Sequence, residues 1–89
     1  ALAEIMDASP SPEVEKKVRE LAQTVDGVSG LDVCYVRKMG LEYFVDLHVL
    51  VDGGVSVRRG HAIAHDVKDA IRNGLPTVRD VLIHIEPAE

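Results

Sequence analysis

The chain has 89 residues, with 10 Lys and Arg against 15 Asp and Glu, and a formal net charge of −5 at pH 7. This length suits one domain rather than two. The acidic balance argues against nucleic acid as a general partner, because phosphates are neutralised by cationic side chains. Cys34 is the single cysteine, which excludes an internal disulfide and favours a reducing compartment. A domain this small buries about 60–65% of the surface of its unfolded chain, so it gains from a metal ion or a second copy.

Residues 1–10, ALAEIMDASP, show no sustained hydrophobic period, and we interpret them as a linker. The chain starts at Ala1 rather than Met, as expected of a piece of a longer protein. No apolar run approaches the roughly 20 residues of a membrane-spanning helix, and no signal peptide is recognisable. Ser11 and Pro12 are typical of an N-cap and a first helical position, and they predict a helix that ends at Asp26-Gly27.

Two strands are predicted next. Residues 30–38 alternate, which predicts a strand with Leu31, Val33 and Tyr35 on one face and Asp32, Cys34 and Val36 on the other. After a turn at residues 38–40, residues 41–51 form a second strand. One of its faces is wholly apolar: Leu41, Tyr43, Val45, Leu47, Val49 and Val51.

A second helix is predicted from about Val57 to Asn73, closed by Gly74. Residues 79–86 form a third strand, with Val81, Ile83 and Ile85 on one face. The order α-β-β-α-β predicts an α+β fold, a two-layer sandwich in which two helices cover one face of a three-stranded sheet.

The other face of the sheet is too apolar for a solvated face and too polar for a core. Its expected members are Asp32, Cys34, Val36, Phe44, Asp46, His48, Leu50, Leu82, His84 and Glu86. Phe44 and Leu50 are most simply contacts with another chain. We interpret Cys34 as a small hydrophobic residue.

Two histidines and several carboxylates on one face suit a borderline divalent metal such as zinc. His61, near the start of the second helix, is expected to reach the sheet edge and add a third nitrogen. His61 and His65 are four residues apart, a spacing that metal sites use and that is more often a solvated flank. A single strand histidine, such as His48 or His84, is likewise more often structural than a ligand, so the site depends on their convergence.

Four segments in this order resemble the C-terminal cytoplasmic domain of the cation diffusion facilitators, membrane transporters that expel zinc, iron, manganese and related divalent ions. The resemblance runs from about Leu2 to Pro87. Its segments are GVSGLDVCYVRKMG from Gly27, FVDLHVLVD from Phe44, SVRRGHAIAHDVKDAI from Ser56 and VLIHIEP from Val81.

This resemblance implies a ferredoxin-like sandwich similar to small copper chaperones, with residues 11–87 as a cytoplasmic metal-binding homodimerisation domain. Its partner besides a second copy would be the transmembrane part of the same integral membrane transporter. It also implies a regulatory metal-sensing role and a divalent ion, zinc or else iron or manganese. The implied ligands are His48, His61 and His84, with Glu86 at the family's Asp or Glu position. Asp32 stands where much of the family has His, and Asp46 is a further candidate because iron-handling members use a carboxylate nearby.

The sequence leaves three other functions to consider. A plain dimerisation module with idle histidines is the main alternative. A free metallochaperone needs a thiolate pair, typically Cys-x-x-Cys, and Cys34 stands alone. An enzyme is not expected, because the chain has neither a Gly-rich phosphate loop nor a nucleophile beside a base. No small-molecule substrate is expected for this domain.

Overall fold

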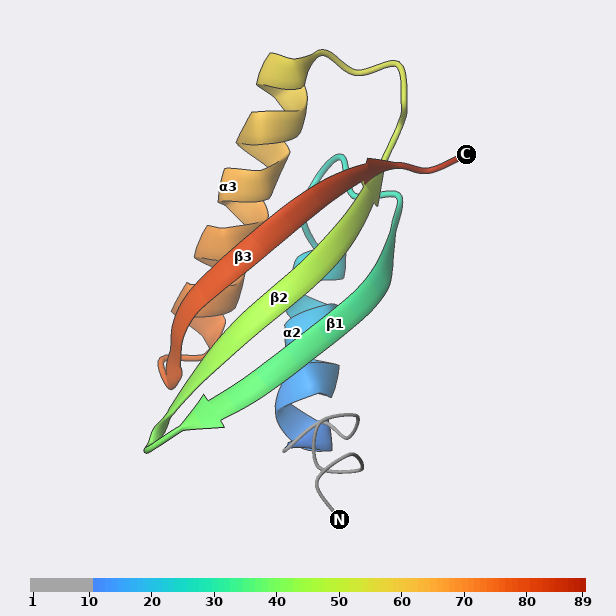
Figure 1. The fold of residues 1–89 in the computed structure, drawn as a ribbon. Coiled ribbons are helices and arrows are strands. Elements are labelled where there is room, and N and C mark those ends of the chain that lie inside the picture. The colour runs from blue at the N-terminus through green and yellow to red at the C-terminus, as the bar shows by residue number, and fades with distance from the viewer. Residues whose placement is uncertain (1–10) are drawn as a thin grey trace.

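The computed structural model describes residues 11–89, and the predicted linker over residues 1–10 lies outside them. Within that part the order α-β-β-α-β is confirmed, as is the two-layer α+β sandwich (Figure 1). The elements are helix α2 (Pro12–Gln23), strand β1 (Gly30–Met39), strand β2 (Glu42–Val51), helix α3 (Val57–Gly74) and strand β3 (Val78–Pro87).

The sheet has the strand order β1-β2-β3. Strand β2 is central: it pairs with β1 in antiparallel and with β3 in parallel orientation. The parallel pair needs a crossover connection, which α3 supplies. Both helices lie on the same side of the sheet, so no helix of residues 11–89 covers its other side (Figure 1). Neither helix between residues 11 and 89 is long and apolar enough to cross a membrane.

Serine side chains start both helices. The Ser11 hydroxyl accepts a hydrogen bond from the Val14 amide at 3.3 Å, and that of Ser56 accepts one from the Arg59 amide at 3.0 Å. These bonds satisfy amides that have no partner within the helix. Helix α2 ends at Gln23, before the predicted Asp26-Gly27, because the Thr24 hydroxyl donates to the Leu21 carbonyl at 2.7 Å and competes with further helical turns.

The core fills the space between the helices and the sheet. The apolar alternation of β2 buries Val45, Leu47 and Val49 against the inner faces of both helices. Leu41 was predicted to continue that face and does not. It lies in the tight turn between β1 and β2 and is 88% exposed, because Met39 already pairs with Glu42 and leaves only two residues to close the hairpin.

The predicted faces of β1 are wrong beyond Leu31. Leu31 pairs with Val49 and Cys34 pairs with Leu47, so two residues of β1, Asp32 and Val33, oppose the single residue His48. This β-bulge shifts the side-chain alternation by one position. Cys34 and Val36 therefore pack against the core rather than on the uncovered face. Val33, Tyr35 and Arg37 are exposed instead.

Two glycines with positive φ allow a matched test of packing against the first half of α3. Gly27 has φ +95°, and a Cβ there would lie 2.7 Å from the buried Ile63 Cδ1; Gly40 has φ +65° and nothing within 4 Å. We expect Gly40→Ala to cost about 1–2 kcal/mol, the backbone penalty alone. Gly27→Ala should add about 1–3 kcal/mol of overpacking. Urea unfolding of both variants measures the difference, and equal losses would contradict the close packing of Gly27 on Ile63.

Candidate metal-binding face

We use the term open face for the side of the sheet away from the helices. The pairing of β2 with β3 arranges the side chains of the open face in cross-strand rows: Asp46 lies opposite Leu82, His48 opposite His84, and Leu50 opposite Glu86. Because β2 and β3 run parallel and in register, histidines that are distant in sequence become direct neighbours. The predicted convergence of His48 and His84 is present in the structure.

His48 lies at the centre of this cluster. Its ring stacks on the ring of His84, with centroids 4.5 Å apart and an interplanar angle of 29°. Its Nδ1 atom is hydrogen-bonded to the Glu86 carboxylate. The side chains of His48 and Glu86 are 25% and 34% exposed, so solvent reaches both. A carboxylate on Nδ1 orients the ring and leaves Nε2 as the atom available to a metal.

The two other carboxylate candidates differ in their surroundings. The Arg37 guanidinium donates a hydrogen bond to Asp46 at 2.9 Å and neutralises its charge. A metal at Asp46 therefore competes with an ion pair. Asp32 sits in the bulge opposite His48, is exposed, and makes no ion pair within residues 11–89. Unlike Asp46, Asp32 therefore has no ion pair within residues 11–89 that a metal would have to displace, and it lies on β1 next to His48.

His61 has a different partner from the one predicted. It lies on α3, and its Nε2 atom is 3.2 Å from the Nε2 atom of His65. The two rings meet edge to face, with centroids 4.6 Å apart. Helix α3 covers the face of the sheet opposite to the open face (Figure 1). Among residues 11–89 no three His, Cys, Asp or Glu side chains gather closely enough to hold a metal ion, so the predicted trio of His48, His61 and His84 does not form within one chain.

Two ionisable groups outside the open-face cluster, Cys34 and Asp80, have shifted pKa values. Burial raises the pKa of the Cys34 thiol to about 11, and the negative charge of Glu15 acts in the same direction. The thiol therefore stays protonated near neutral pH, unlike the thiolate that metals bind. The Lys68 ammonium, 3.1 Å from Asp80, lowers the pKa of that carboxyl by a hydrogen bond, helped by the Val81 amide.

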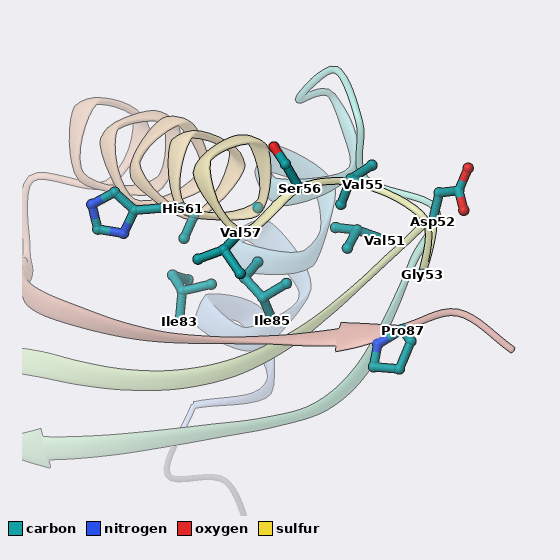
Figure 2. A pocket seen from close by; sticks show the side chains of 12 residues that line it. Val51, Asp52, Gly53, Val55, Ser56, Val57, His61, Ile83, Ile85 and Pro87 are labelled. Atoms are coloured by element: carbon teal, nitrogen blue, oxygen red, sulfur yellow. The ribbon is translucent and has the colours of Figure 1, made fainter.

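One hollow of the described residues lies away from the open face. It has a volume of about 530 Å³ and lies between the start of α3, the end of β3 and the loop between β2 and α3 (Figure 2). Its lining is mostly aliphatic, with Val55, Val57, Ile83 and Ile85 among the contributors. The two histidines of the open face do not line it. The candidate site is therefore separate from this hollow.

Sequence reasoning missed two residues of the open face. Arg37 pairs with Asp46, and Tyr35 lies opposite Asp46 across the β1–β2 ladder. Strict alternation assigned Tyr35 to the core. Neither of the two bulge residues, Asp32 and Val33, is a glycine, so the local sequence carries no clear signal for the bulge.

Comparison with known proteins gives a consistent result. Residues 10–88 match the family described as the cytoplasmic domain of cation efflux proteins. The chain is 31% identical over 88 residues to Metal tolerance protein C1 of Arabidopsis thaliana and 32% identical over 85 residues to Metal tolerance protein 2 of Oryza sativa. It covers 19% and 22% of these relatives, and 28% of the manganese efflux system protein MneP of Bacillus subtilis, to which it is 26% identical. The chain thus spans well under a third of each relative.

Solved structures share the fold. A histidine-to-alanine variant of MamM-CTD superposes with a TM-score of 0.84 at 25% identity, covering 86% of this chain and 96% of that one. A nickel form of another MamM-CTD variant gives a TM-score of 0.87 at 23% identity, covering 89% of this chain and 100% of that one. A cadmium form of a third variant gives 0.85. These likenesses confirm the ferredoxin-like sandwich.

Proposed function

Because this chain belongs to the family of cation efflux protein cytoplasmic domains, we propose that it is the metal-sensing dimerisation domain of a divalent-cation transporter. Metal would bind at the open face and join two copies of the domain. The ion is a borderline divalent cation, with zinc or iron favoured over harder ions because the cluster contains imidazoles as well as carboxylates. The domain would then report the cytosolic metal level to the transmembrane part of its own chain.

The observation that supports this proposal most strongly is His48 placed between His84 and Glu86 on the side of the sheet that no helix covers. The donor set fits a divalent metal. Two imidazoles supply nitrogen ligands, and a carboxylate hydrogen-bonded to the Nδ1 of His48 fixes the ring, as the outer partners of metal-binding histidines usually do. Glu86 in this arrangement orients His48, or becomes a ligand itself if it releases Nδ1.

A single copy supplies too few ligands. A structural zinc site has four ligands, whereas no group of three gathers within residues 11–89 of one chain. A two-fold axis parallel to the sheet, between two open faces that face each other, would bring His48 and His84 of one copy close to the same residues of a second. Tyr35 and Leu82, each 56% exposed, flank Asp46 on opposite sides in one row across the sheet. Their apolar surface suits a contact with the second copy.

Sensing follows from linkage. A ligand that binds the joined pair more tightly than separate or splayed copies shifts the population toward the joined pair, by as much as its difference in affinity. Partly solvated ligands such as His48 and Glu86 favour a site that empties when cytosolic metal falls.

A plain dimerisation module is the second candidate function. It is favoured by the ion pair between Arg37 and Asp46, which satisfies one candidate ligand without metal, and by the lack of a three-ligand group in the described chain. The two candidates share the dimer and differ in whether metal strengthens it.

The discriminating experiment is isothermal titration of zinc into the domain near neutral pH. Glu86→Gln removes an outer partner of His48 and should lower the zinc affinity of the tightest site by about 10–100-fold. His48→Ala and His84→Ala each remove a ligand and should lower that affinity by more than this. The melting temperature should change little, because these side chains lie outside the core and leave no cavity.

His65→Ala is the matched control, since it removes an exposed histidine from α3 and leaves the open face intact. It should keep the tightest site at full affinity. A silent titration of the unmodified domain would favour the plain dimerisation module. Unfolding of His48→Ala or His84→Ala would show that the histidine is structural.

A further inference from the structure

The turn between β1 and β2 carries two large apolar side chains that the described chain leaves in contact with solvent. Leu41 is 88% exposed and Met39 is 62% exposed. Met39 pairs with Glu42, so only Gly40 and Leu41 close the hairpin. Gly40 has φ +65°, which suits the first position of a two-residue turn. The turn is therefore tight and presents Leu41 at the tip of the hairpin, and exposed apolar side chains rimmed by polar ones are typical of an interaction site.

The surface around this tip has an excess of positive charge, although the whole chain carries a net charge of −5. Lys38 precedes Met39 on β1, and Arg72 lies in the last turn of α3, at the same end of the domain (Figure 1). Both are exposed, and no ion pair within residues 11–89 involves either of them. The other charges nearby cancel in two ion pairs: Arg79 with Glu42 at 3.9 Å, and Lys68 with Asp80 at 3.1 Å. An apolar tip flanked by uncancelled cations complements an anionic lipid surface, which offers both negative headgroups and hydrocarbon.

We propose that the β1–β2 turn, through Leu41, Met39 and Lys38, contacts the surface of a membrane that contains anionic phospholipids. The membrane is the one that holds the transmembrane part of the same chain, so this inference rests on the proposed function. The turn and the start of α2 lie at the same end of the domain, opposite to the loop between β2 and α3 (Figure 1). Under the proposed function the transmembrane part is joined through the residues before Ser11, and ten residues span at most about 33–36 Å. The end of the domain that carries the turn is therefore kept within reach of the membrane.

Covalent attachment allows a weak contact to be occupied. Each Lys or Arg near an anionic membrane surface raises the affinity by about fivefold, and a short flexible linker gives the attached domain an effective concentration in the millimolar range. The negative charges far from the tip oppose binding little, because charges more than about 8 Å from the surface are largely screened at physiological ionic strength. His48 lies six residues along β2 from Glu42, about 20 Å at the rise of a strand. The contact therefore leaves the open-face cluster free to meet a second copy.

The test follows methyl signals of the 89-residue chain by NMR in the presence of lipid nanodiscs. One set of discs contains phosphatidylcholine alone, and the other also contains about one third phosphatidylglycerol, to supply the anionic headgroups. Both carry a lipid with a spin-labelled headgroup, which broadens the signals of nearby methyl groups. At millimolar lipid, the anionic discs should broaden the signals of Leu41 and Met39. Val57 is the control within the same chain, because it is 91% exposed but begins α3 at the opposite end of the domain, and its signals should stay sharp.

Two substitutions separate the apolar from the electrostatic contribution. Leu41→Ser should lower the affinity for anionic discs by about tenfold, because the side chain that enters the lipid is lost. Lys38→Gln should lower it by about fivefold, because one cation is lost. Val57→Ser is the matched control variant: it removes an equally exposed apolar side chain and should leave the affinity unchanged. All three positions are exposed, so unchanged methyl signals from the core verify that each variant is folded.

Three results would overturn the proposal: sharp Leu41 signals with the anionic discs, equal broadening by the neutral and anionic discs, or equal affinities of Leu41→Ser and the unmodified chain. The first of these results would assign the tip to a protein partner instead of lipid. Failure of the proposed function appears differently, as a silent zinc titration of the same chain without discs, because the tip carries none of the open-face ligands.

Discussion

Leu82→Asp is expected to turn a dimeric domain into a monomer in the absence of metal. Leu82 projects from β3 on the open face with 56% of its surface exposed, and Asp46 lies opposite it on β2. In a dimer formed through the open face, the new carboxylate would be buried without a cation and next to a like charge. Breaking an interface in this way costs several kcal/mol, and each 1.4 kcal/mol is a factor of ten in the dissociation constant. We expect that constant to rise by at least about 100-fold.

Sedimentation velocity over a concentration series measures the change. The unmodified domain should remain dimeric at tens of micromolar, a range in which interfaces of standard size are usually formed. Leu41→Asp is the matched control, because Leu41 is 88% exposed in the β1–β2 turn, at the tip of the hairpin. It makes the same chemical change and should leave the dimer intact. Dissociation of both variants, or of neither, would place the interface elsewhere on the surface.

The sequence is sufficient to predict the element order and the faces of β2 and β3. In β2, a polar residue alternates with an aliphatic residue from Asp46 to Val49, and burial alternates with the same period up to Val51. The neighbouring positions of β2 and β3 then follow from the crossover through α3, because consecutive parallel strands usually lie side by side. The convergence of His48 and His84 on one face was therefore predictable, whereas the register that places them directly opposite each other is seen only in the structure.

The rest was not predictable for two physical reasons. The bulge at Asp32 and Val33 inserts one residue into β1 and moves every later side chain to the other face. That change brings Arg37 to Asp46, so one candidate ligand is already neutralised. The second reason concerns α3: periodicity fixes that His61 and His65 share a flank of the helix, but not which neighbours that flank meets. The contact between the two rings depends on side-chain rotamers.

Metal affinity at the open face is expected to fall by about 100-fold between pH 8 and pH 5.5. An imidazole nitrogen must be free of its proton to bind a metal, and the ordinary pKa of imidazole is about 6.5. At pH 5.5 about one imidazole in ten is neutral, so each histidine ligand costs about a factor of ten. Two histidine ligands in the set give about 100-fold, and a site shared by two copies would lose more.

The shape of the pH profile separates the ligand sets. Carboxylates ordinarily titrate near pH 4, so a site made of carboxylates alone would keep its affinity between pH 8 and pH 5.5. Isothermal titration of zinc at several pH values provides the measurement, and His84→Ala provides the control. The His84→Ala variant has one histidine ligand fewer per copy, so its zinc affinity should fall by only about tenfold over the same pH range. A flat profile in the unmodified domain would remove His48 and His84 from the ligand set. Equal slopes in the two proteins would remove His84 alone, because a proton that competes with the metal must leave an atom that the metal occupies.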